Sequence, residues 1–127
     1  MKDKHIILSL ILVLLVGGIA QADMILTASW YSVESLKKEG TYKYSKGVMV
    51  NGKLFDDNKL TCAVRCFPLG AVLRITNISN NRYVVVEVAD RIGKRFGKTR
   101  IDLSRLAFSK LDKLEKGLIS VKVERIK

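Results

Sequence analysis

Apolar and polar residues alternate over several short segments of the chain, and this period of two is typical of β-strands that bury one face. The clearest segment is 83–89, where valines dominate and β-branched side chains favour an extended backbone. Residues 71–76 alternate in the same way, so the two segments and the polar loop between them predict a hairpin. Further strands are predicted over residues 24–31, 48–50 and 119–124, with a short apolar step at 101–103.

One stretch has clear helical spacing. Residues 104–114 repeat apolar side chains near this spacing, with Ser104 as the expected N-cap and Gly117 as the stop. Residues 35–39 could add a single helical turn that ends at Gly40. Several short strands, one short helix and turn signals between them predict a mainly β protein, a small barrel with a helix at one end.

The first 22 residues have the features of a secretory signal peptide. A basic start precedes an apolar run over residues 6–19, and Ala20-Gln21-Ala22 has the small-x-small pattern of a cleavage site. The run is shorter than the roughly 20 residues of a membrane span. We therefore expect cleavage after Ala22, a domain over residues 23–127 without a stable membrane anchor, and a periplasmic or secreted location. An uncleaved anchor is the alternative.

The chain is strongly basic, with a formal net charge of +11. Loss of Lys2, Asp3 and Lys4 with the leader would leave +10 on residues 23–127. Such a charge on a small domain indicates an anionic partner or surface, and a solvated surface without a specific ligand is the alternative. Positive charge is the only feature of the chain that favours a nucleic-acid partner. Because the leader indicates export, we expect no such partner. We also expect a monomer.

The chain has one histidine and two cysteines, and this limits the possible chemistry. The one histidine, His5, lies in the predicted leader, so the mature domain is expected to use neither Ser-His nor Cys-His catalysis and to hold no histidine-bound metal. Cys62 and Cys66 are four residues apart, which favours a disulfide closing a short loop in an exported protein. Free thiols on one face of a helix are the alternative.

Two aspartates flank a glycine-spaced basic loop over residues 92–100. Asp90 ends the valine-rich strand, and Asp102 lies in the next apolar step. A carboxylate at a strand end is held by the strand and left open by the loop, so both are candidate catalytic groups. The alternative is that both are structural, capping a turn or accepting backbone amides. Trp30 and Tyr31 could stack on sugar rings or belong to the core.

Short motifs follow one another in a characteristic order over residues 23–127: ASWY at 28–31, NG at 51–52, FD at 55–56, LT at 60–61, FPLG at 67–70, VLRITN at 72–77, VV at 85–86, DR at 90–91 and IDLS at 101–104. Together with the valine-rich final strand, this series resembles the rare lipoprotein A family of bacterial cell-wall proteins. The resemblance implies a six-stranded double-psi β-barrel, related in fold to expansins and barwin.

The resemblance also implies a function. Members of that family look like lytic transglycosylases, which cut peptidoglycan glycan strands between N-acetylmuramic acid and N-acetylglucosamine and leave a 1,6-anhydro end, without a cofactor or metal. It implies Asp90 as the acid/base and Asp102 as a second cleft carboxylate. The candidate substrate contacts are Trp30, Tyr31, Asn51, Lys53 and Arg91.

The chain departs from the family pattern at three places. Lys53 stands where the family usually has glutamate, Val64 where it usually has histidine, and Ile92-Gly93 where Gly-Pro usually follows the Asp-Arg pair. These differences support an alternative function, a non-catalytic wall-binding or wall-loosening module similar to expansins.

Overall fold

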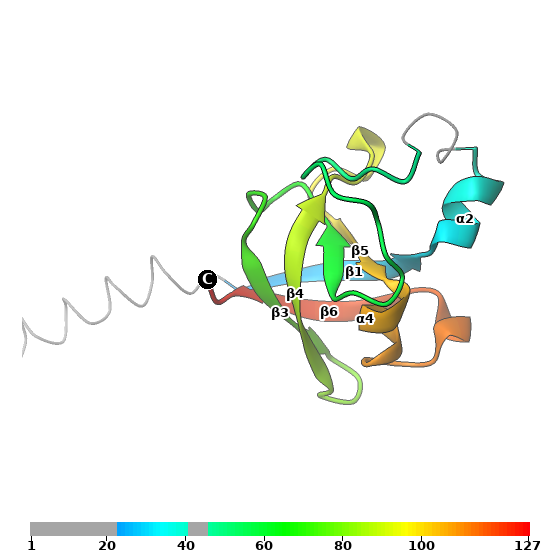
Figure 1. The fold of residues 1–127 in the computed structure, drawn as a ribbon. Coiled ribbons are helices and arrows are strands. Elements are labelled where there is room, and N and C mark those ends of the chain that lie inside the picture. Colours follow the sequence, from blue (N-terminus) through cyan, green and yellow to red (C-terminus); the bar gives the residue numbers. More distant parts are fainter. Residues whose placement is uncertain (1–22, 41–45) are drawn as a thin grey trace, which may run out of the picture.

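A computed structural model describes residues 23–40 and 46–127 of the chain, and six strands in this part close into a barrel (Figure 1). The order around the barrel is β1-β5-β2-β4-β3-β6. The strands are β1 (Met24–Tyr31), β2 (Thr61–Ala63), β3 (Val72–Asn77), β4 (Tyr83–Asp90), β5 (Arg100–Ser104) and β6 (Ile119–Arg125). The expected six-stranded barrel is thus confirmed.

The barrel contains both antiparallel and parallel strand pairs. Strands β3 and β4 form the expected antiparallel hairpin, with Leu73 across from Val86. Strands β1 and β5 run parallel, as do β2 and β4, although each pair is far apart in sequence. Parallel neighbours cannot be joined by a tight turn, so in each of these pairs a long crossover connection separates the two strands in the sequence.

The interior is filled by the apolar side of each strand. Leu73, Ile75, Ile101 and Leu103 are fully buried there, and Phe108 packs against them from a helix. Residues next to them in sequence point outward, because successive side chains of a strand face opposite sides. This alternation sends Ser29, Tyr31 and Asp102 to the outside of the barrel.

One short helix was expected over residues 104–114 with a possible further turn over residues 35–39, and the structure has a helix at both places, the first of them shorter than expected. The described residues contain two short α-helices, α2 (Val33–Lys38) and α4 (Arg105–Ser109), and two 3-10 turns, η1 (Lys94–Phe96) and η2 (Leu114–Lys116). Ser104 does cap α4, since its Oγ accepts the amide of Ala107 at 3.2 Å.

Helix α4 ends at Ser109, and the segment that leaves it is bound to the β3–β4 hairpin. The side-chain amides of Asn77 and Asn80 both donate to the carbonyl of Leu111, at 3.0 and 2.9 Å. That carbonyl is therefore engaged outside the helix. Gly117, the predicted stop of this helix, instead ends the separate turn η2, with φ +69°.

The predicted strand over residues 48–50 was also wrong. This segment makes one isolated bridge, from Val48 to Leu54, around a tight turn at Gly52 with φ +87°. Its backbone binds the end of β4 instead, where the Asn51 amide donates to the Ala89 carbonyl at 3.1 Å. The resulting loop, 46–55, lies beside Asp90.

The predicted leader, residues 1–22, lies outside the described residues. Within the described ranges no helix is long and apolar enough to cross a membrane.

Candidate functional site

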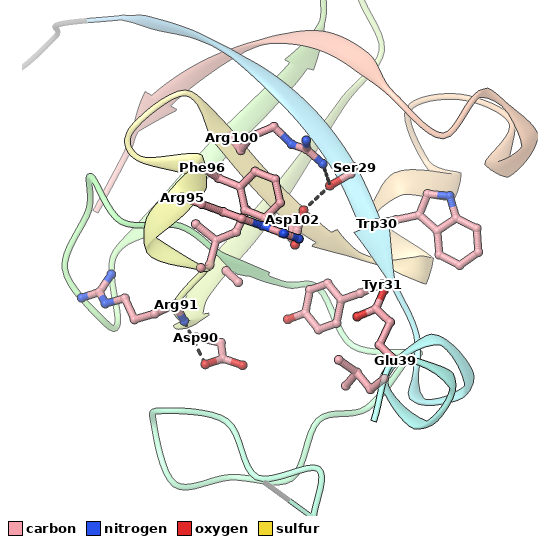
Figure 2. Close-up of a pocket in the computed structure, with 14 residues that line it drawn as sticks. Ser29, Trp30, Tyr31, Glu39, Asp90, Arg91, Arg95, Phe96, Arg100 and Asp102 are labelled. Atoms are coloured by element: carbon pink, nitrogen blue, oxygen red, sulfur yellow. Dashed lines mark hydrogen bonds between the residues drawn. The ribbon is translucent and has the colours of Figure 1, made fainter. Parts of the chain in front are cut away.

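A pocket of about 510 Å³ opens on the outer side of the barrel, over β1, β5, β2 and the end of β4 (Figure 2). Both candidate aspartates line it, together with Ser29, Tyr31 and residues of the basic loop. The small side chain of Ala63 lies between the strands that carry the acids. Strand alternation thus brings together residues that are up to 73 positions apart in the chain.

Asp90 is held by the backbone at the end of β4. Its Oδ1 accepts the amides of Val50, at 3.1 Å, and of Arg91, at 2.8 Å. The described residues give Oδ2 no hydrogen-bond partner. The backbone of Asp90 is also fixed, because its carbonyl accepts the amide of Val64 at 3.2 Å. Asp90 therefore combines a set orientation with one open carboxyl oxygen.

Asp102 is bound from the neighbouring strand. Ser29 lies directly across from it in the β1–β5 pairing and donates its hydroxyl proton to Asp102 Oδ1. Arg100 in turn donates to Ser29 Oγ at 3.0 Å. Burial raises the pKa of Asp102 above its ordinary value, while Ser29 and Arg100 act in the opposite direction.

Tyr31 lies between the two acids. Its ring stacks on Phe55, with centroids 4.4 Å apart, in a second apolar cluster that includes Ala63 and Ala89. Its hydroxyl is buried and has no hydrogen-bond partner in the described part of the chain. Such an unpaired buried group costs about 1–3 kcal/mol. Burial, followed by the charges of Asp90, Cys62 and Asp102, raises the pKa of Tyr31, and the nearby Thr61 hydroxyl opposes this rise.

One wall of the pocket is cationic and aromatic, a feature that motif reasoning did not assign. The guanidinium groups of Arg95 and Arg100 both lie 4.7 Å from the ring centroid of Phe96, and all three residues line the pocket. The basic loop over residues 92–100 was visible in the sequence, but only the fold turns it toward the acids.

Arg91 faces away from the carboxyl group of Asp90 (Figure 2). Its Nη1 donates to the carbonyls of Val64, at 2.8 Å, and Phe67, at 2.6 Å. The side chain therefore anchors the loop that follows β2, and its predicted substrate contact stays a prediction.

The other predicted contacts are spread around the site. Trp30 lines the pocket, but its ring packs on the barrel core and its Nε1 donates to the Leu114 carbonyl at 3.0 Å. Asn51 and Lys53 belong to the adjoining loop, where Asn51 Oδ1 accepts the Lys53 amide at 2.9 Å, and they are not among the residues that line this pocket.

Cys62 and Cys66 are free thiols in this structure. Cys62 lies on β2 and is buried, and Cys66 is half-buried in the loop that follows. The alternative of a helical pair does not hold, because neither residue is in a helix. The disulfide stays a prediction. Across residues 23–40 and 46–127, no three His, Cys, Asp or Glu side chains are grouped to hold a metal.

A closed barrel with two parallel strand pairs and a side pocket containing two aspartates defines this chain as a double-psi β-barrel protein. The model of the lytic transglycolase family matches residues 24–123, so the chain belongs to that family. This confirms the resemblance inferred from the motifs.

Named relatives support the same family. The chain is 39% identical over 103 residues to the endolytic peptidoglycan transglycosylase RlpA of Pseudomonas aeruginosa, covering 81% of this chain and 27% of that protein. It is 40% identical over 76 residues to the RlpA of Campylobacter jejuni, covering 60% of this chain and 27% of the relative. The match thus spans about a quarter of each relative's length.

Two solved structures share the fold. The Streptomyces papain inhibitor matches with a TM-score of 0.64 and 21% identity, covering 84% of this chain and 96% of the inhibitor. A Clavibacter michiganensis expansin in complex with cellohexaose matches with a TM-score of 0.61 and 17% identity, covering 84% of this chain and 51% of the expansin.

Proposed function

We propose that this protein is a peptidoglycan lytic transglycosylase that cuts glycan strands to 1,6-anhydro ends. One observation carries the proposal: Asp90 and Asp102 line one pocket in a member of the lytic transglycolase family. The relatives named as peptidoglycan transglycosylases support the substrate class. The positive charge of the chain suits an anionic wall.

Asp90 acts first as a general acid in this proposal. Its carboxyl proton moves to the glycosidic oxygen while the bond from that oxygen to the anomeric carbon of N-acetylmuramic acid breaks. The resulting carboxylate then takes the proton of the C6 hydroxyl of the same sugar, and O6 forms the new bond to the anomeric carbon. No water is consumed, and Asp90 regains its proton.

The surroundings of Asp90 support this role. Backbone amides hold one carboxyl oxygen, and the other is open to a ligand, which suits a group that must meet two different oxygens in turn. A single carboxyl is sufficient because no separate nucleophile or water has to be activated. Asp102 is the supporting carboxyl, and Arg95 and Arg100 form a cationic wall beside the sugar.

A second candidate function is glycan binding without cleavage. The exposed Lys53 beside the pocket, where the family usually has glutamate, is the observation that favours it. This function predicts binding to cell walls that weakens with added salt and no anhydro products.

Mass spectrometry of soluble products separates the two functions. Residues 23–127 are incubated with purified peptidoglycan and with peptide-stripped glycan strands. We expect 1,6-anhydro-ended products, and loss of about 100-fold or more of the rate in Asp90→Asn. Asp56→Asn is the matched control, because Asp56 is exposed, is not among the residues that line the pocket, and uses its carboxyl group to accept the Asn58 amide of its own loop. A wild-type protein that binds the wall and releases nothing would instead support the binding function.

We also propose that the protein is exported through residues 1–22 and acts in the cell envelope. The mass of the protein recovered from the periplasm or the medium tests this. A mass matching residues 23–127 is expected, and recovery of the full chain from the cytoplasm alone would contradict export.

A further inference from the structure

Tyr31 presents a polar group that the fold itself leaves unused. Only 9% of the residue is exposed, and stacking on Phe55 fixes the ring. The hydroxyl points into the space between Asp90 and Asp102 (Figure 2). Buried hydroxyls usually have a hydrogen-bond partner. This one makes no hydrogen bond of normal geometry with the described residues, and its polar neighbour, the Thr61 hydroxyl, is itself unpaired while lying near enough to lower the pKa of Tyr31.

The ring face cannot serve as a sugar platform in this arrangement, because Phe55 covers it and the residue is buried. The contribution of Tyr31 to the pocket is therefore its O–H group. Burial and the two neighbouring carboxyl groups raise the pKa of Tyr31, so the phenol keeps its proton and stays a donor over the whole working range of pH.

We propose that the Tyr31 hydroxyl is a catalytic group that donates a hydrogen bond to an oxygen of the glycan bound between Asp90 and Asp102. This inference rests on the proposed function and adds a donor to the acid/base. No proton leaves Tyr31: the leaving glycosidic oxygen receives its proton from Asp90, and the phenol stabilises the negative charge that develops on oxygen as the bond breaks.

Removal of such a hydroxyl should affect stability and activity differently. In the ligand-free protein the hydroxyl is an unpaired buried group, so its removal should leave stability unchanged or raise it. In the complex it has a partner, so its removal should lower the rate. A structural tyrosine would show the opposite, a loss of stability with activity changing only through unfolding.

Tyr31→Phe tests the inference, because phenylalanine keeps the ring and its stacking on Phe55. We expect kcat/KM for anhydro-product release to fall by about 10- to 100-fold, with an unchanged pH profile and an unchanged or raised melting temperature. Tyr83→Phe is the control, because Tyr83 is 63% exposed on β4 and is not among the residues that line the pocket. It should retain full activity.

The outcomes separate this inference from the proposed function. Wild-type cleavage that persists in Tyr31→Phe would overturn the inference and leave the proposed function standing. If the wild type binds sacculi without cutting them, the transglycosylase proposal fails. Weaker binding by Tyr31→Phe would then still support a contact between Tyr31 and the glycan. Equal binding by the two proteins would overturn the Tyr31 inference as well. A Tyr31→Phe protein that fails to fold would overturn the inference by showing a structural role, and so would a wild type that neither binds nor cuts.

Discussion

Ser29 lies directly across from Asp102 in the parallel pairing of β1 and β5, and its hydroxyl donates a hydrogen bond to the aspartate. Arg100 donates to the same hydroxyl, so Ser29 links a guanidinium group to a carboxyl group. The parallel register creates this contact, since β1 and β5 are separated by most of the domain.

Removal of this hydroxyl should change both the titration and the stability of the site. Ser29 lowers the pKa of Asp102 against the effect of burial, so Ser29→Ala should move the titration of the Asp102 carboxyl to higher pH in a carbon-detected NMR experiment. Because the lost hydrogen bond is to a charged group, we expect the free energy of unfolding at pH 7 to fall by about 1.5 kcal/mol. Ser29→Thr keeps the hydroxyl and should restore both values; equal titrations in all three proteins would contradict the role.

Asp102 should make stability depend on pH. Since burial raises its pKa in the folded state, the folded protein binds this proton more tightly than the unfolded chain does. Its stabilising contribution is therefore present below the ordinary aspartate pKa of about 4 and is lost as pH rises through the folded-state pKa. Asp102→Asn should be more stable than wild type at pH 7, with the difference shrinking toward about pH 4. Urea unfolding measured across this range checks it, and a stability difference that stays the same at every pH would contradict it.

Arg91 should act as a positioning residue for the end of β4. Its guanidinium group binds the carbonyls of Val64 and Phe67, and the Val64 amide donates to the Asp90 carbonyl. Arg91→Ala should therefore lower the free energy of unfolding by about 1.5–3 kcal/mol and speed hydrogen exchange at the Val64 amide.

The control for Arg91 is Arg82→Ala, on an exposed loop, which should leave exchange at Val64 unchanged. If Arg91→Ala keeps wild-type exchange but loses glycan binding, the side chain contacts substrate, as the motif reasoning predicted.

The two thiols should differ in reactivity when reduced. Burial raises the pKa of both thiols. Cys62 is buried, whereas Cys66 is only half-buried. A maleimide should modify the half-buried Cys66 first and reach Cys62 only on unfolding. Protein exported to an oxidising compartment should resist both reactions and weigh two hydrogens less, if the predicted disulfide forms there. Peptide mapping of the labelled protein checks both statements, and equal labelling of the two cysteines in the folded reduced protein would contradict the first.

The local pattern of apolar and polar residues was sufficient to predict the longest strands. Alternation and β-branched residues located β1, β3, β4 and β6 because each has several residues with one face in the core. Strand β2 was missed because three residues are too few to show a period. The helix over residues 104–114 was drawn too long, because the apolar residues after Ser109 continue the helical spacing while their backbone leaves the helix and binds Asn77 and Asn80 from another part of the chain.

The sequence by itself determined that this protein is a small, basic, mainly β domain of the lytic transglycolase family, and it identified Asp90, Asp102 and Tyr31 as candidates. Only the tertiary structure decided how they meet. The parallel pairing of β1 with β5 sets Ser29 against Asp102, and the loop over residues 46–55 binds Asp90. Phe55 stacks on the ring of Tyr31, which is buried. These contacts join residues far apart in the chain, and no local pattern of polarity encodes the register that creates them.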